Sequence, residues 1–287
     1  MISVACIGEA MIELSLVGNN AQLGVAGDTL NTAIYLHRAA PNIQVDFITC
    51  LGDDPFSGRI CDFMAVQGIG ASAVRKIKGA SPGLYAIATT PEGERSFTYW
   101  RSNAAARQLF ADHDFSLLER YDAVYLSGIS LAILPHDIRL ALIDYLKASS
   151  LRVIYDSNYR PRLWDSIDSA RRVTAAMWAR TDIALPSIDD EMLLFDETAD
   201  QVTARFAKHK GQGALKRGPK GPLSIGQAVP QSYRHAPSVI DTTAAGDSFN
   251  GGYLAALLTG KTQSEALSEG HALAAVVIQH RGAIIPE

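Results

Sequence analysis

Residues 240–252 read IDTTAAGDSFNGG, and the fold and chemistry of the chain are decided around this stretch. Its small residues lead into a helical pattern that continues through Tyr253, Leu257 and Leu258 and stops at Gly260. Small residues at the start of a helix let backbone N–H groups approach an anion closely, and the helix dipole favours negative charge there. The stretch therefore predicts a helix whose amino end binds an anion.

Asp247 lies in the first turn of this predicted helix. A bound phosphate would repel the carboxylate, so an acid is expected there only if it has a task, and general-base catalysis is such a task. The alternative is structural, because Asp247 would also cap the helix while the glycines permit close packing. The segment alone leaves both interpretations open.

The rest of the chain alternates short apolar runs with longer helical patterns. Strand-like runs fall at residues 3–7, 44–51, 123–126, 151–155, 182–185 and 213–216. Helical patterns fall at residues 29–39 and 56–67, on the face formed by Ile138, Leu142, Tyr145 and Leu146, and in two helices that close the chain. This alternation predicts an α/β fold with a mostly parallel central sheet and helices on both faces. Such sheets bind ligands at the carboxyl ends of their strands.

Two stretches interrupt the alternation. Residues 11–17 form a strand pattern directly after the first strand, and residues 83–90 and 95–101 flank the sequence PEGE, which is typical of a hairpin. Strands inserted into an α/β series must leave the main sheet. We therefore expect a single domain over residues 1–287, with a small β-sheet lid built from residues 9–20 and 79–103.

The composition favours a globular enzyme. Of the 287 residues 47% are hydrophobic, and the net charge is -4 with Arg and Lys scattered along the chain, whereas nucleic-acid-binding proteins carry a basic face. The first residues lack the basic region of a signal peptide, and no apolar run approaches the roughly 18 residues of a membrane span. The three cysteines have no metal-ligand spacing and fit core positions in a reducing compartment. We therefore expect a cytoplasmic protein that binds neither nucleic acid nor membranes.

Three motifs resemble those of the ribokinase-like (PfkB) carbohydrate kinases. Residues 241–249, DTTAAGDSF, are similar to the C-terminal signature of this family, which usually has Gly where this chain has Ala244. The Ala form is similar to the variant of the 2-keto-3-deoxygluconate kinases. Residues 24–33, GVAGDTLNTA, resemble the Gly-rich substrate-binding turn, and residues 51–58, LGDDPFSG, resemble a strand exit of the family. The motifs come in family order and span nearly the whole chain, which implies a ribokinase-like fold.

The resemblance implies catalytic roles for the first motif. Asp247 matches the family's general base, which takes the proton from the acceptor hydroxyl as it attacks the γ-phosphate of ATP. The backbone amides of Ala244, Ala245 and Gly246 match the anion hole for the transferring phosphoryl group. Phosphoryl transfer needs mainly positioning and charge neutralisation, so a base, a backbone cradle and Mg²⁺ suffice.

The resemblance also implies residues for ATP and magnesium. The ATP-binding set is Asn158, Arg160, Ser187, Lys216, Gly218, Gly221, Ala244 and Gly246. Residues 216–221, KRGPKG, are similar to a turn that lines the nucleotide site, although an ordinary basic turn would look the same. Residues 186–191, PSIDDE, fall where the family organises magnesium through water, which makes Asp190 and Glu191 the candidate carboxylates. The same run is also a good helix N-cap, so both interpretations stay open.

The acceptor site implied by the resemblance calls for a sugar acid. Its residues are Gly27, Asp28, Asn31, Tyr85, Tyr99, Arg101, Arg160 and Asp247. A carboxylate on the acceptor gives a physical reason for arginine, whose fork of donors matches it, whereas a neutral hexose does not need one. Aromatic residues on strands are often packing residues instead.

We therefore expect an ATP-dependent kinase for the 6-hydroxyl of 2-keto-3-deoxygluconate. A PfkB kinase for fructose, ribose or a nucleoside such as adenosine stays open, as does a non-catalytic nucleotide-binding protein of the same fold. A dehydrogenase is a weaker alternative, since no Gly-x-Gly-x-x-Gly follows the first strand. The strand edges of a lid would suit a homodimer or higher homo-oligomer, and Asp241 and Thr243 would suit a monovalent-cation site, as in some relatives.

Overall fold

The central sheet of the computed structural model orders its strands β13-β12-β11-β10-β9-β1-β4. The structure describes residues 2–17, 20–89, 95–230 and 232–286. The strand bounds are β1 (Ser3–Ile7), β4 (Gln44–Ile48), β9 (Ala123–Ser127), β10 (Arg152–Asp156), β11 (Ile183–Ala184), β12 (Gln212–Leu215) and β13 (Leu223–Ile225). Every pairing is parallel except that of β12 with β13. The carboxyl ends of the parallel strands therefore lie along one edge of the sheet.

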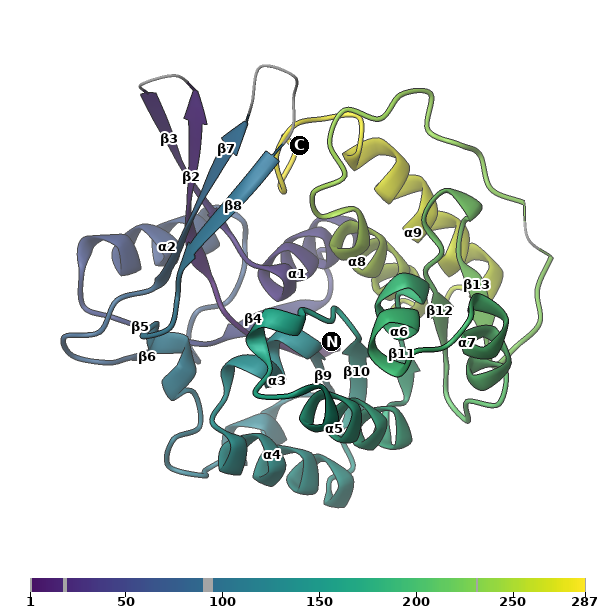
Figure 1. The fold of residues 1–287 in the computed structure, drawn as a ribbon, viewed down its shortest axis with the longest axis horizontal. Helices are drawn as coiled ribbons and strands as arrows, with labels where there is room; N and C mark the ends of the chain where they lie inside the picture. Colours follow the sequence, from purple (N-terminus) through teal and green to yellow (C-terminus); the bar gives the residue numbers. More distant parts are fainter. Residues whose placement is uncertain (1, 18–19, 90–94, 231, 287) are drawn as a thin grey trace.

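Helices cover both faces of this sheet (Figure 1). One face carries α1 (Asp28–Ala39), α2 (Pro55–Val66), α8 (Ala245–Leu258) and α9 (Gln263–Val277), and the other carries α3 (Gly128–Ile133), α4 (His136–Ala148), α5 (Ile167–Arg180), α6 (Ile188–Phe195) and α7 (Ala199–Phe206). Short 3-10 turns lie at η1 (Ala105–Gln108), η2 (Ser116–Arg120) and η3 (Pro161–Leu163). Successive side chains of β1 alternate between the two cores, since Val4 and Cys6 enter one and Ala5 and Ile7 the other.

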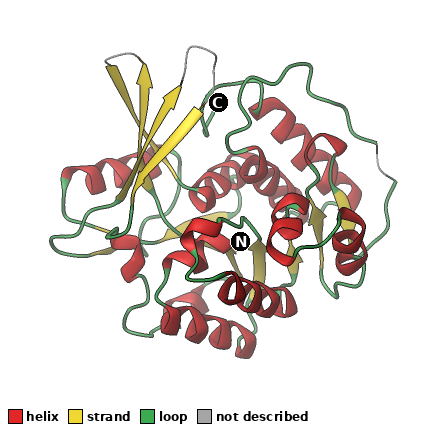
Figure 2. Cartoon of the chain, in the orientation of Figure 1, coloured by secondary structure: helices red, strands yellow, loops and turns green. Residues whose placement is uncertain are grey.

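A second, smaller sheet stands apart from these layers, as Figure 2 shows. Its order is β3-β2-β7-β8, with β2 (Met11–Val17), β3 (Asn20–Ala26), β7 (Gly83–Thr89) and β8 (Arg95–Trp100). We call this sheet the lid. Its inner face packs Met11, Ala26, Tyr85 and Ile87 against Ala283 near the C-terminus. The predicted α/β fold, with a mostly parallel sheet and a small separate sheet, is confirmed.

Two details differ from the prediction. The predicted strand at 44–51 splits, because β5 (Cys50–Leu51) pairs with β6 (Arg75–Lys76) in a sheet of its own. Cys50 and Leu51 remain buried, so the apolar run does not reveal the change of sheet. The first lid segment also continues to Ala26, because β3 pairs antiparallel with β2 along its whole length. Most of β3 is exposed, which leaves no alternating pattern to find.

Two further predictions concern the turn of the lid hairpin and helices that could span a membrane. The PEGE turn of the predicted lid hairpin, at 91–94, lies outside the described residues, although β7 and β8 on either side pair antiparallel. Within the described part of the chain, no helix is both long enough and apolar enough to cross a membrane.

Candidate active site

The amino end of α8 lies open to an anion. Ala244 precedes the helix in a left-handed conformation, with φ of 58°, and no side chain caps the first turn. The first N–H groups of a helix have no partner within it. The Ala245 N–H donates to the Thr242 carbonyl at 3.2 Å, so an anion would compete with this carbonyl for the donor. A methyl group placed on Gly246 would lie 3.7 Å from Lys216 Nζ. The predicted anion hole of Ala244, Ala245 and Gly246 therefore has an ammonium group beside it.

Asp247 is held at this helix end by α1. Asn31 Nδ2 donates to Asp247 Oδ2 at 2.8 Å, and Thr32 Oγ1 donates to the Asp247 carbonyl at 3.3 Å. Burial raises the pKa of Asp247 to about 7, and the charges of Asp28 and Asp156 act in the same direction. The Asn31 hydrogen bond and Lys216 oppose this rise in pKa. A carboxyl with a pKa near neutrality suits the exchange of a proton with a ligand hydroxyl.

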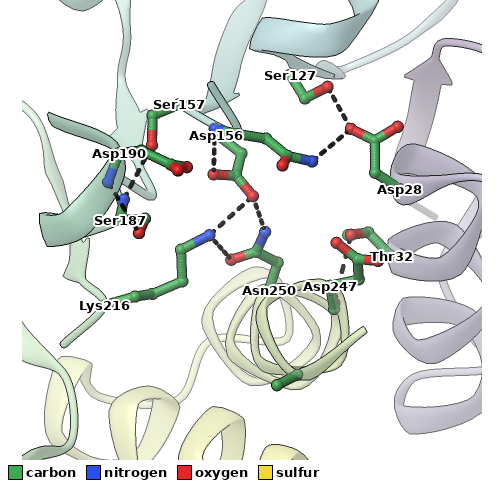
Figure 3. A network of polar contacts seen from close by, with 12 residues as sticks. Asp28, Thr32, Ser127, Asp156, Ser157, Ser187, Asp190, Lys216, Asp247 and Asn250 are labelled. Carbon is green, nitrogen blue, oxygen red and sulfur yellow. Dashed lines mark hydrogen bonds and ion pairs between the residues drawn. The ribbon is translucent and has the colours of Figure 1, made fainter. Parts of the chain in front are cut away.

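A second carboxylate, Asp156, fixes the position of Lys216. Figure 3 shows Lys216 and Asn250 pointing to Asp156 at the end of β10. Lys216 Nζ donates to Asp156 Oδ2 at 2.7 Å and to Asn250 Oδ1 at 3.2 Å, and Asn250 Nδ2 donates to Asp156 Oδ2 at 2.6 Å. Sequence reasoning missed Asp156 and Asn250. The signals were present, since Asp156 ends a predicted strand and Asn250 follows Asp247 by almost one helical turn.

Asp28 begins α1 and links it to the ends of two strands. Its Oδ2 accepts hydrogen bonds from Ser127 Oγ, at the end of β9, and from Asn158 Nδ2 at 2.8 Å. Burial raises the pKa of Asp28, and the Ser127 hydrogen bond opposes the rise. Asn158 was predicted to bind ATP, and one of the two N–H groups of its side-chain amide is engaged by Asp28. Asp28, Asn31 and Asp247 thus come together, as the predicted acceptor site requires.

The lid contributes Tyr85, Tyr99 and Arg101. The Tyr85 and Tyr99 rings stack with centroids 5.6 Å apart, and Tyr99 is half exposed. Arg101 follows β8 and its Nη2 forms an ion pair with Glu9, a buried carboxylate that sequence reasoning missed. Among the described residues, Arg101 Nε and Glu9 Oε1 are buried without partners. Arg101 is therefore not wholly free for an acceptor, because part of its charge is already compensated.

Two glycines allow the backbone to close around Glu9. A methyl group on Gly27 would lie 2.2 Å from the Glu9 carbonyl oxygen, and one on Gly83 would lie 2.5 Å from Glu9 Oε1. The first distance leaves no room for a side chain, because the contact is with backbone, whereas the second would require the Glu9 carboxylate to move. Gly27, predicted to bind the acceptor, thus has a packing reason to be glycine in addition to any contact with a ligand.

The two candidate magnesium carboxylates face different surroundings. Glu191 is fully buried, where it accepts hydrogen bonds from Trp178 Nε1 at 3.1 Å and Arg205 Nη2 at 2.8 Å. Burial raises the pKa of Glu191 to about 7, against the effect of Arg205. Both Glu191 oxygens are engaged in the core, which leaves Asp190 as the better placed of the two carboxylates predicted to hold magnesium through water.

Asp190 faces the other way, toward the loop after β10. Its Oδ2 accepts from the Tyr159 N–H at 3.1 Å, and its Oδ1 lies 3.5 Å from Arg160 Nη1. Burial raises the pKa of Asp190, opposed by Arg160. Ser187 caps α6 by accepting from the Asp190 N–H, so its hydroxyl serves the helix. Magnesium keeps several of its waters, and a lone, partly exposed carboxylate such as Asp190 fits a contact through one of them. In the described residues no group of three or more acidic, His or Cys side chains forms a metal site.

The predicted nucleotide turn follows Lys216. Gly218 begins η4 (Gly218–Lys220) with φ of 54°, and Gly221 ends it with φ of 72°. A methyl group on Gly221 would also lie 2.4 Å from the Tyr233 ring. Left-handed backbone and close packing therefore both require glycine at 221.

Asp241, a candidate for a monovalent-cation site, anchors the loop before α8. Its Oδ1 accepts from Thr243 N–H and Oγ1 at 3.0 and 2.7 Å, and its Oδ2 accepts from the Gly282 N–H at 2.8 Å. These bonds tie the segment of Ala244 to the C-terminal residues. The cation site stays a prediction.

The sequence and the fold of this chain are similar to those of known proteins. The family model described as pfkB family carbohydrate kinase matches residues 1–287. A 2-dehydro-3-deoxygluconokinase from Dickeya dadantii is 43% identical over 303 residues, covering 99% of this chain and 97% of that protein. The solved structure of a PfkB protein from Polaromonas sp. JS666 has a TM-score of 0.84 at 26% identity and covers 98% of this chain and 96% of its own. An uncharacterized sugar kinase from Pyrococcus horikoshii, solved in complex with ATP, has a TM-score of 0.80 at 21% identity, covering 98% of this chain and 93% of that one.

Proposed function

Because the chain belongs to the pfkB family of carbohydrate kinases, we propose that it transfers the γ-phosphoryl group of ATP to the 6-hydroxyl of 2-keto-3-deoxygluconate. The predicted family and its ribokinase-like fold are confirmed, and the protein is a carbohydrate kinase. The proposal concerns the acceptor and the residues that act on it. One observation carries it: the Asp247 carboxyl, with its pKa raised to about 7, lies at the uncapped amino end of α8 beside Lys216.

In the proposed reaction Asp247 takes the proton of the acceptor hydroxyl. The hydroxyl oxygen forms a bond to the γ-phosphorus, the bond from this phosphorus to the β–γ bridging oxygen breaks, and ADP leaves with that oxygen. The amides of Ala244, Ala245 and Gly246 hold the transferring phosphoryl oxygens, and Lys216 Nζ adds a positive charge nearby. Asp156 and Asn250 keep this ammonium in place through their hydrogen bonds to it.

Magnesium bound with ATP would supply neutralisation of the phosphate charge. Asp190 would hold it through a water molecule, and Glu191 would take no part because Trp178 and Arg205 occupy its oxygens. Arg160 Nη1 lies 3.5 Å from Asp190 Oδ1, and the Arg160 side chain is 53% exposed. It is therefore able to reach either an ATP phosphate or the acceptor.

The acceptor assignment rests on the relatives and on arginine. The Dickeya dadantii relative, 43% identical over nearly its whole length, is named for 2-dehydro-3-deoxygluconate, the same sugar acid. Arg101 and Arg160 would share its carboxylate, with Tyr85 and Tyr99 covering the carbon chain. Closing the lid over the acceptor would exclude water and so prevent hydrolysis of ATP. The need for ATP agrees with the cytoplasmic location expected from the sequence.

A panel of acceptors in a coupled ADP-release assay tests the proposal. The purified protein with MgATP is offered 2-keto-3-deoxygluconate, fructose, ribose, adenosine and no acceptor. We expect the highest kcat/KM with the sugar acid and a product phosphorylated at carbon 6 by NMR. A neutral sugar or nucleoside with the higher kcat/KM would overturn the acceptor, and absence of ADP release with every acceptor would favour a non-catalytic nucleotide-binding protein.

The proposal also includes self-association through the lid. Strands β3 and β8 form the two edges of this sheet, and a strand edge offers unpaired backbone groups to a second subunit. Light scattering coupled to size-exclusion chromatography would give a dimer or larger species, and a monomer at micromolar concentration would refute this part.

A further inference from the structure

Glu13 and Tyr85 lie directly opposite each other on the lid strands β2 and β7. Their side chains share the inner face of the lid, and Tyr85 Oη donates a hydrogen bond to Glu13 Oε2. Ser15 Oγ donates to the other carboxylate oxygen, Glu13 Oε1, at 3.0 Å. The carboxylate is thus held by two hydroxyl donors, and the Tyr85 proton is committed to it.

Tyr85 belongs to a cluster that packs against Ala244, the residue before α8. Its ring is buried among Met11, Ala26, Ile87 and Ala283, and Tyr99 stacks on it. Burial raises the pKa of Tyr85, and the charges of Glu13 and then of Asp247 contribute. Tyr85 therefore stays a phenol, and its hydroxyl lies within electrostatic range of the proposed base.

A phenol has one proton to donate and oxygen lone pairs that accept. Hydrogen bonds to a carboxylate are about twice as strong as those between neutral groups, so a sugar is a poor competitor for the Tyr85 proton. We infer that Glu13 sets the hydrogen-bonding direction of Tyr85, so that Tyr85 accepts a hydrogen bond from an acceptor hydroxyl and offers no donor to a carboxylate or keto oxygen.

This inference deepens the proposed function and rests on it. It makes Glu13 a positioning residue that acts through Tyr85, and it orients the acceptor. A carbon bearing a hydroxyl lies against Tyr85, near Asp28 and Asp247, where an acceptor carboxylate would also be repelled. The acid end of the substrate then lies toward Arg101 and Arg160. Substrates are recognised at Tyr85 by a hydroxyl that is not the one phosphorylated.

A double-mutant cycle tests whether Glu13 acts through Tyr85. Glu13→Ala, Tyr85→Phe and the double variant are compared with wild type in kcat and KM for acceptor and ATP. We expect each single change to raise the acceptor KM about tenfold and to leave the ATP KM within about twofold. The double variant should be no worse than Tyr85→Phe, because removing the partner of an absent hydroxyl changes nothing more.

Two further variants separate hydrogen-bond direction from structure. Glu13→Gln keeps an oxygen that accepts from Tyr85, so its acceptor KM should stay within about threefold of wild type. Thr98→Ala, on the opposite and exposed face of β8, is the matched lid control and should change neither KM nor Tm. Wild type and Glu13→Gln should discriminate against acceptor analogues lacking the hydroxyl at carbon 4 or carbon 5, whereas Glu13→Ala should accept one of them nearly as well as the full substrate.

The outcomes distinguish the inference from the proposed function. The inference fails, and the proposed function stands, if wild type phosphorylates the sugar acid but Glu13→Ala keeps a normal acceptor KM. It also fails if Glu13→Ala raises the acceptor KM as much in the Tyr85→Phe background as it does in the wild type. An acceptor KM for Glu13→Gln as high as that of Glu13→Ala would also overturn the inference, because an oxygen that accepts the Tyr85 hydrogen bond would then not be sufficient. If wild type phosphorylates no sugar acid, the proposed acceptor fails and takes this inference with it.

Discussion

Replacing Asp247 with Asn removes the basicity of the side chain and keeps its shape. Asn31 Nδ2, which donates to Asp247 Oδ2 at 2.8 Å, would still find an amide oxygen. General-base catalysis contributes about 10²- to 10⁴-fold, so we expect kcat to fall by about this factor, equivalent to about 3–5 kcal/mol of barrier. The KM for ATP should change less than about twofold, because the backbone amides and Lys216 are untouched. An ADP-release assay with both substrates varied gives these constants.

The pH dependence follows from the same carboxyl. Burial, and then the charge of Asp28, raise the pKa of Asp247 to about 7. A base acts when it is deprotonated, so kcat/KM for ATP, which reports the enzyme without nucleotide, should fall about tenfold per pH unit below pH 7 and be flat above it. The Asn variant should lose this ionisation from its profile.

The same substitution should stabilise the protein. In the folded state the pKa of Asp247 rises from 3.8 to about 7, so the native state binds more protons than the unfolded state between these values. Stability is therefore lost as the pH rises through this window, and above pH 7 the full penalty of the buried charge remains. An amide carries no such penalty, so Asp247→Asn should be more stable at pH 8 by on the order of 1–4 kcal/mol. Urea unfolding at pH 5 and pH 8 measures the difference, which should be larger at pH 8.

Asp200→Asn is the matched control. Asp200 lies in the first turn of α7, as Asp247 does in α8, and it is exposed. This substitution should alter neither turnover nor the pH profile. An Asp247→Asn enzyme that keeps more than about a tenth of wild-type turnover would refute the base assignment, and one that is less stable at pH 8 would refute the assigned pKa.

Three other predictions rest on the described contacts. Lys216→Met should lower kcat/KM for ATP at least tenfold or so in the ADP-release assay, and should lower Tm because it leaves Asp156 with one donor fewer. Arg160→Ala should raise the KM for a sugar acid while sparing Tm in a melting curve, since its side chain is 53% exposed. Asp190→Asn should raise the Mg²⁺ concentration needed for half-maximal rate, whereas Glu191→Gln should leave it unchanged, because Trp178 and Arg205 engage the Glu191 oxygens.

The sequence was most informative where a residue's role depends on its near neighbours. Ala244, Gly246 and Asp247 form a local unit, because the amino end of a helix and the acid in its first turn need no distant segment. The alternation of strands and helices predicts the central sheet for a similar reason, since each element carries its own period. The lid was found at β2 from its strand pattern and at β7 and β8 from the turn between them, and it was missed at β3, whose first residues are exposed on an edge.

Contacts between residues far apart in the chain could not be predicted from the sequence. Glu191 and Asp190 are adjacent and chemically alike. Glu191 points into the core, where Trp178 and Arg205 donate hydrogen bonds to it. Asp190 instead accepts a hydrogen bond from the Tyr159 N–H. A helix turns by about 100° per residue, so neighbours face different surroundings. Arg101 was assigned to the acceptor without Glu9, because 92 residues separate the two along the chain.

The strength of the base is set by groups that the fold gathers from distant segments. The negative charge of Asp28 raises the pKa of Asp247, and the positive charge of Lys216 lowers it. Phosphate charge that magnesium leaves unneutralised at the end of α8 would lie close to Asp247 and would draw on the positive charge of Lys216. Both effects raise the pKa of the carboxyl. Nucleotide binding would therefore make Asp247 a stronger base at the moment when the acceptor must lose its proton, while the free enzyme keeps it partly ionised near pH 7.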